Sequence, residues 1–334
     1  MLTIAVLVGL AWTYRDTLRL SSEQQGGADR ALIPTLARWS RLQPGPWPKG
    51  ALFGDSLAGC PTTTVAKVVG HPAPAHGLVF MLDATFAGMH PLQFYALLGD
   101  VLAGRPTAVV VEVNFPALAA SVHSSESAVY RQMSRKLPLA AIPRLWGPLA
   151  REGMGLFDPL IFRAFAALDM LYVVDGIRER SHQALEDWGT AVDAALDLPV
   201  VRFLELPGFD AARARAVFGD DQTHSPSVQV FRMIAHDLRA AGVPVLFYVS
   251  PVNVHVLDDL GVRRTLDLPA HVEAVRVAIG ATANEWLDLH DLLPATAFKD
   301  AWGHMLDPGC EAVASTLLTR LGVVARVPLP PPEP

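Results

Sequence analysis

The chain has 334 residues, of which 51% are hydrophobic and 18% charged, and its formal net charge is -6. This apolar composition excludes a disordered protein, and the lack of any basic cluster in the sequence argues against a nucleic-acid partner. Two cysteines are too few for a disulfide-dense scaffold or a four-cysteine metal site.

The first 20 residues form an apolar segment in which the charges start only at Arg15. The uncharged run is shorter than the roughly 20 residues that span a bilayer, and no basic region precedes it as in a signal peptide. Three interpretations stay open: a clipped or mis-started membrane anchor, a signal-like segment, or a buried helix. We expect one of the first two, with membrane association through the N-terminus and an extracytoplasmic location, periplasmic or at the cell surface. A cytoplasmic location is the alternative.

Residues 21–49 are expected to form a linker or lead-in to a domain at 50–326. In that domain short apolar runs rich in β-branched residues alternate with helical patterns, which predicts an α/β fold. Nearly continuous apolar runs are typical of strands covered on both faces, as in a parallel sheet. We expect strands at 51–53, 77–82, 108–113, 243–249 and 286–289, and helices that include 91–102 and 228–241.

Residues 119–227 interrupt this alternation, because they contain no convincing strand and read as helices and loops. Their charges argue against a membrane-spanning segment. We interpret the segment as a large helical insertion that shapes a substrate site, rests on a bilayer or only completes the core. The Pro-rich tail at 327–334 is expected to be extended.

Ser56 lies in the motif Gly-Asp-Ser-Leu at 54–57, between an expected strand and an expected helix. One interpretation is structural, because serine is a common helix N-cap. The other is chemical: an exposed hydroxyl at this position is a nucleophile, and the N–H of the same residue helps to bind an oxyanion.

His304 is the candidate base for such a nucleophile. A serine hydroxyl needs a nearby imidazole to remove its proton, and a carboxylate can orient that imidazole. Asp300 precedes His304 in the sequence and is the candidate carboxylate. A helix is expected from residue 311 onward.

Gly88 and Asn114 are candidate oxyanion ligands, because they follow the second and third expected strands. A glycine lets its backbone N–H approach a substrate closely, and an asparagine amide can donate to a developing oxyanion. Each alone is an ordinary turn residue, so the argument rests on their order along the chain.

Taken in order, these blocks resemble the SGNH (GDSL) hydrolase superfamily, whose name lists Ser, Gly, Asn and His. The resemblance covers residues 50–116 and 243–320 and leaves the insertion uncovered. It implies a flavodoxin-like three-layer α/β/α sandwich with a parallel five-stranded sheet, and ester chemistry without a metal or other cofactor. It assigns Ser56, His304 and Asp300 to catalysis and Ser56, Gly88 and Asn114 to the oxyanion hole.

The sequence departs from the family pattern in two places. The family usually has Asp-x-x-His, whereas three residues lie between Asp300 and His304. We expect Gly303 to let the loop take up the extra residue; a Ser–His dyad, or Asp307 as the partner of the imidazole, are the alternatives. The third block usually reads Gly-x-Asn-Asp and here reads Glu-Val-Asn-Phe at 112–115, so only Asn114 is kept.

The segment Ser-Pro-Val-Asn at 250–253 is similar to the corresponding loop of DltD-like proteins, which are membrane-anchored and act beside membrane-bound O-acyltransferases. This resemblance implies a serine-dependent ester hydrolase or O-acyltransferase that forms an acyl-enzyme. Its substrate would be an acylated cell-envelope polysaccharide or glycolipid, and its partner a membrane-bound O-acyltransferase. The alternatives are a non-catalytic SGNH scaffold that binds a glycan or an acyltransferase, and a cytoplasmic lipase or thioesterase.

A disulfide between Cys60 and Cys310 is a further hypothesis, because Cys60 lies one helical turn after Ser56 and Cys310 six residues after His304. If Ser56 and His304 meet, the two cysteines approach each other as well. Weaker candidates are a metal site at Asp220, Asp221 and His224, where we expect a solvated loop instead, and pocket-lining roles for His255 and His290.

Overall fold

The computed structural model describes residue 39 and residues 49–69, 80–85, 91–119, 209–219 and 221–322. The expected membrane segment at 1–20, most of the insertion, the Pro-rich tail and Gly88 lie outside the described residues. Among the helices that are described, none is long and apolar enough to cross a membrane.

The described chain is built on a five-stranded sheet in which every pair of neighbouring strands is parallel. The strand order is β2-β1-β3-β4-β5, which is the flavodoxin-like order and confirms the expected fold class. The strands are β1 (Lys49–Gly54), β2 (Phe80–Thr85), β3 (Ala108–Val113), β4 (Val245–Val249) and β5 (Trp286–Asp288).

Strand β2 ends three residues later than the sequence predicts, and the predicted residues 77–79 lie outside the described part of the chain. Its last three residues pair with Leu52, Phe53 and Gly54 of β1, so the sheet extends the strand past the apolar run that marked it in the sequence. Pairing with β1 satisfies the backbone of Asp83, which strand propensity alone would not place in a strand.

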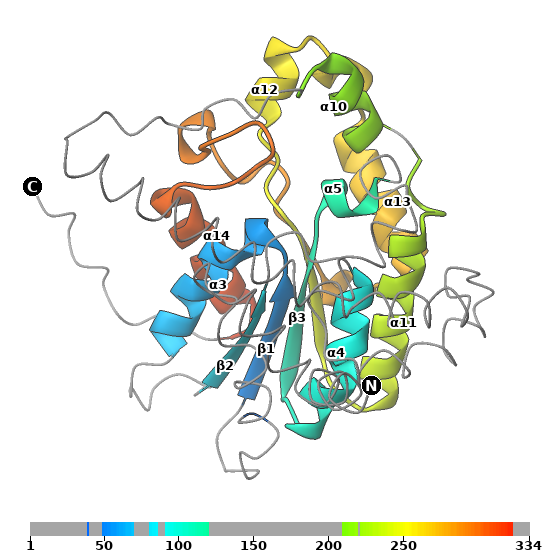
Figure 1. The fold of residues 1–334 in the computed structure, drawn as a ribbon, viewed down its shortest axis with the longest axis vertical. Helices are drawn as coiled ribbons and strands as arrows, with labels where there is room; N and C mark the ends of the chain where they lie inside the picture. The colour runs from blue at the N-terminus through cyan, green and yellow to red at the C-terminus, as the bar shows by residue number, and fades with distance from the viewer. Residues whose placement is uncertain are drawn as a thin grey trace, which may run out of the picture.

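Helices cover both faces of the sheet (Figure 1). On one face lie α3 (Ser56–Val69) and α14 (Asp307–Arg320), which contact each other; on the other face α11 (Pro226–Ala240) contacts both α4 (Pro91–Ala103) and α13 (Leu268–Ile279). The shorter helices are α5 (Phe115–Leu118), α10 (Ala211–Phe218) and α12 (Val254–Asp259), with 3₁₀ turns at Arg263–Thr265, Ala283–Glu285 and Ala295–Ala297.

Alternate residues of each central strand enter two separate cores, as the period of a strand requires. Val109 and Val111 of β3 pack with the residues of α4, α11 and α13, whereas Val110 packs with α3 and α14. The nearly continuous apolar runs of the sequence therefore correspond to strands buried on both faces. By the same alternation, Glu112 lies on the α3 face of the sheet.

Trp39 shows that the folded domain includes part of the segment expected to be a linker. Its side chain is fully buried, and its indole N–H donates to the Val101 carbonyl at 2.8 Å. The Lys49 ammonium lies 5.9 Å from the centre of the indole ring. The core thus begins before residue 50, because a residue of the lead-in packs on α4.

Candidate active site

Ser56 is the first residue of α3, directly after the turn that leaves β1. Its side chain lies outside the described part of the structure. Asp55 accepts the N–H of Leu57 on its carboxylate at 2.7 Å, and its carbonyl accepts the N–H of Ala58 at 3.2 Å. Asp55 therefore performs the capping role that the sequence left open for Ser56.

The loop between residues 298 and 305 brings Asp300 and His304 into contact. Phe298 and Met305 form an antiparallel bridge, and the Lys299 N–H donates to the His304 carbonyl at 2.9 Å. Within this closed loop Asp300 Oδ2 lies 2.6 Å from His304 Nδ1. Asp300 Oδ1 also accepts the backbone N–H of His304 at 3.1 Å, so one carboxylate holds both the backbone and the ring of the histidine.

Gly303 forms a tight bend in this loop. Its φ of 102° belongs to the region that favours glycine, and a Cβ there would lie 3.1 Å from the Pro251 carbonyl oxygen. Asp307, the alternative partner, is an exposed residue at the start of α14. The carboxylate partner of His304 in the structure is Asp300.

Burial and hydrogen bonding shift the pKa of the Asp300 carboxyl in opposite directions. Its side chain is 7% exposed, and burial raises its pKa, but the hydrogen bonds and charge of His304 together outweigh burial and leave the pKa below the ordinary value. An ionised Asp300 accepts a hydrogen bond from the Nδ1–H of the ring, and in this tautomer Nε2 carries the basic lone pair. The imidazole is 24% exposed and accessible to a reactant.

Three observations place this loop against the start of α3. A Cβ on Gly303 would lie 3.9 Å from Leu57 Cδ1, and the charge of His304 is near enough to Asp55 to offset part of the rise that burial causes in the pKa of that carboxyl. The disulfide between Cys60 and Cys310 joins α3 to α14, with 5.6 Å between the Cα atoms, which confirms that sequence hypothesis. Residues about 250 positions apart therefore meet beside Ser56, at the carboxyl ends of the strands.

Asn114 lies at the end of β3 and is buried. Its Oδ1 accepts the Ala117 N–H at 2.7 Å, which caps the short helix α5. Its amide is near enough to Asp55 to offset part of the rise that burial causes in the pKa of that carboxyl. The structure thus brings Asn114 next to the turn that carries Ser56. An amide NH₂ group has two donors, so a bond to Asp55 leaves one for a substrate oxygen.

Glu112 and Ser250 are site residues to which the sequence analysis gave no role. Glu112 Oε2 accepts the Asp55 N–H at 2.7 Å, and Glu112 Oε1 accepts the hydroxyl of Ser250. The sequence did carry a signal for Glu112, because it is the one charged residue in the apolar run at 108–113. A carboxyl group in a strand covered on both faces must find buried hydrogen-bond partners.

Trp302, between Asp300 and His304, connects the loop at 298–305 to the described end of the segment 119–227. Its ring lies 4.8 Å from the ring of Phe209 and 5.4 Å from the guanidinium of Arg213 on α10. This described end therefore packs directly on the loop that carries the candidate base.

The structure describes most of the remaining sequence candidates. Asp221 uses one carboxylate oxygen for the N–H and hydroxyl of Thr223, and His255 is exposed on α12. Asp220 lies outside the described residues, and no metal-binding group of three His, Cys, Asp or Glu is found within them. His290 is buried, with Nδ1 2.7 Å from Asp288 Oδ1.

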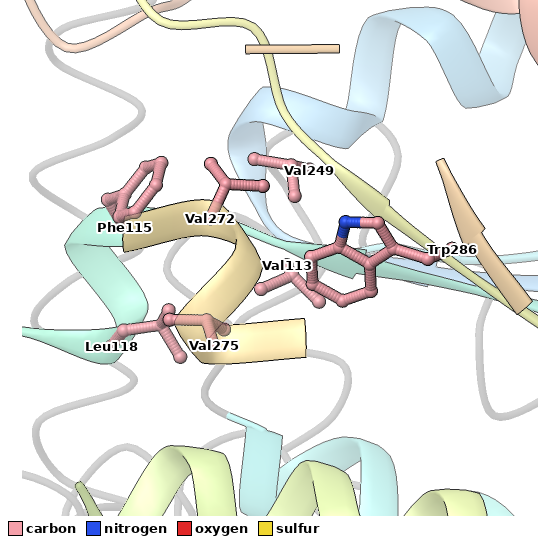
Figure 2. A pocket seen from close by; sticks show the side chains of 7 residues that line it. All are labelled: Val113, Phe115, Leu118, Val249, Val272, Val275 and Trp286. Carbon is pink, nitrogen blue, oxygen red and sulfur yellow. The ribbon is translucent and has the colours of Figure 1, made fainter. Parts of the chain in front are cut away.

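An apolar gap lies on the face of the sheet opposite Glu112, between β3, β4 and α13 (Figure 2). It has no room for a water molecule. We interpret it as a packing gap of the core. The candidate reaction site is the polar cluster on the other face. The gap is lined by Val113, Phe115, Leu118, Val249, Val272, Val275 and Trp286.

No protein-family model matches the chain, and no curated protein matches its sequence.

Proposed function

We propose that the protein is a serine-dependent carboxylic-ester hydrolase or O-acyltransferase of the SGNH type. The observation that carries the proposal is the contact of 2.6 Å between Asp300 and His304, in a loop that lies against the start of α3. Ser56 is the first residue of that helix. A carboxylate-oriented imidazole next to a serine is the arrangement that nucleophilic acyl transfer requires.

In the proposed reaction, His304 Nε2 takes the proton of the Ser56 hydroxyl while the serine oxygen attacks the acyl carbon. The N–H groups of Ser56 and Gly88 and the amide of Asn114 bind the oxyanion that forms. The bond to the alcohol then breaks, and His304 gives its proton to that alcohol. Water or a sugar hydroxyl then attacks the acyl-enzyme and loses its proton to His304. The bond between the acyl carbon and the Ser56 oxygen breaks, and His304 returns the proton to that oxygen.

We extend the proposal to an acylated polysaccharide or glycolipid of the cell envelope, with a membrane-bound O-acyltransferase as partner. The support is the Cys60–Cys310 disulfide, because disulfides persist in oxidising compartments outside the cytoplasm. A second support is the direct contact of Trp302 with α10. Through this contact the described end of the insertion borders the proposed reaction site, where a large substrate would bind.

The test is covalent labelling of the full chain by a fluorophosphonate probe, which reacts with activated serines. We expect wild type to be labelled and Ser56→Ala and His304→Ala to lose the label. Ser315→Ala, on the exposed face of α14, is the matched serine control and should label like wild type. Wild type that labels no better than Ser56→Ala would favour the non-catalytic scaffold instead.

A further inference from the structure

Glu112 is a buried acid that connects three strands at their carboxyl ends. It is 1% exposed, and its two carboxyl oxygens bind the Asp55 N–H, after β1, and the Ser250 hydroxyl, after β4. An acid is rarely fully buried unless its hydrogen-bonding groups are satisfied. The position of Glu112 is therefore set by the turn that carries Ser56.

The same turn depends on Glu112 for its shape. The Asp55 N–H that Glu112 binds belongs to the peptide after Gly54, one peptide before the Ser56 N–H. A Cβ on Gly54 would lie 2.8 Å from Glu112 Oε2 and 2.2 Å from the Cβ of Ala58. Glycine at the start of the motif thus leaves the space into which the Glu112 carboxyl fits.

Glu112 and Asp55 form a buried pair of acids, in which the backbone N–H of Asp55 donates to Glu112 Oε2. Burial and then the nearby Asp55 charge raise the pKa of Glu112 well above its usual value. Burial also raises the pKa of Asp55, but hydrogen bonds from Leu57 and Asn114 and the charge of His304 partly offset this. Two adjacent buried carboxylates repel, so the pair keeps one proton, and these neighbours place it on Glu112.

We propose that protonated Glu112 is a positioning residue for Ser56, which holds the turn at residues 54–56 in its reactive shape. This inference rests on the proposed function. The neutral acid accepts the Asp55 N–H and donates its proton to the Asp55 carboxylate, so that both acids are satisfied. An ionised Glu112 would add a second negative charge next to the oxyanion and oppose its formation.

The groups that face Glu112 in the described structure are few. Asp55 approaches from the end of β1 and Ser250 from the loop after β4, while His304 lies beyond Asp55 on the loop before α14. Asp55 and His304 are the ionisable side chains among them. A pH effect is therefore assigned to Glu112 by comparing wild type with a variant that differs at Glu112 alone.

The decisive comparison is the rate of fluorophosphonate labelling of Glu112→Gln and Glu112→Ala in the full chain. Glutamine keeps an acceptor for the N–H and a donor for the Asp55 carboxylate but has no proton to lose. We expect Glu112→Gln to label within about threefold of wild type. We expect Glu112→Ala to label about 10- to 100-fold more slowly, since misplacing a reacting group by about 1 Å has an effect of that order. Glu311→Gln, exposed on α14, is the control.

The pH profile separates positioning by the neutral acid from a purely structural role. The two proteins share every ionisable group except Glu112. The ratio of the Glu112→Gln rate to the wild-type rate should therefore stay level or rise from pH 6 to pH 9. A ratio that falls with pH would show that the ionised carboxylate is the working form, and would overturn the inference.

Equal labelling of Glu112→Ala and wild type, or equally slow labelling of both variants with unchanged circular dichroism, would overturn the inference while the proposed function stands. Absence of Ser56-dependent labelling in wild type would remove the proposed function itself.

Discussion

Asp300 and His304 form a pair with 2.6 Å between Oδ2 and Nδ1, although the sequence places three residues between them. The pair exists because the loop is closed at Phe298 and Met305 and Gly303 has a positive φ. The Asn253 amide also donates to the Asp300 carbonyl at 3.2 Å and ties the loop to the end of β4. The acid and the base of the candidate triad are therefore in contact.

Replacement of Asp300 by asparagine should lower the labelling rate and the ester hydrolysis rate by roughly 10²–10⁴-fold, because the ring of His304 then loses the carboxylate that sets its tautomer. The two rates are measured on purified protein with unchanged circular dichroism. Asp307→Asn is the matched comparison and should keep the wild-type rates. The reverse pattern would make Asp307 the partner of His304.

The Gly303→Ala variant should lose activity through the loop backbone. An alanine at φ 102° is strained by about 1–3 kcal/mol, and its Cβ would press on the Pro251 carbonyl, so His304 should shift. Gly261→Ala is the control, because Gly261 also has a positive φ but has open space around it. We expect both variants to melt at lower temperature and only Gly303→Ala to lose labelling. Equal labelling of the two would contradict this account of the loop.

The Cys60–Cys310 disulfide should stabilise both the fold and the site. The denatured but unreduced chain should contain no free thiol, and the reduced chain two. Loss of the cross-link in the double variant Cys60→Ser, Cys310→Ser should lower the free energy of unfolding by about 2–5 kcal/mol. It should also slow labelling, because α3 begins at Ser56 and α14 follows His304. Two thiols before reduction would disprove the disulfide in the isolated protein.

The Asp288–His290 pair should contribute a pH-dependent part of the stability. The hydrogen bond to Asp288 raises the pKa of His290, so the folded state favours the charged ring. The contribution is fully present below the ordinary histidine value of 6.5 and is lost as the pH rises through the raised pKa of the folded state.

Urea unfolding of wild type and Asp288→Asn between pH 5 and pH 9 measures this contribution. We expect the variant to be less stable by roughly 1–3 kcal/mol at pH 5.5, with the difference shrinking toward pH 9. His255→Gln, at an exposed histidine, should keep the wild-type pH dependence. A stability difference that grows with pH would contradict the raised pKa.

The sequence by itself was sufficient to predict the fold class and the order of its elements. Apolar runs such as 108–113, alternating with helical patterns, can be buried only in a parallel sheet covered on both faces, and this architecture is confirmed. Local pattern also identified Ser56, which lies between an expected strand and an expected helix. Asp300 and His304 became candidates because a serine nucleophile needs an imidazole oriented by a carboxylate. The carboxyl end of β2 and the core position of Trp39 were missed, since both depend on neighbours that local pattern does not reveal.

Only the tertiary structure decided how these residues are combined. Asp55 and Glu112 are 57 positions apart and Glu112 and Ser250 are 138 apart, so nothing local in the sequence indicates their contacts. The choice of Asp300 over Asp307 likewise depends on how the loop closes, and the contact of Trp302 with α10 depends on how the insertion packs. Residue type determines what chemistry a side chain can perform, whereas its partners and its protonation are determined by which distant strand ends the fold brings together.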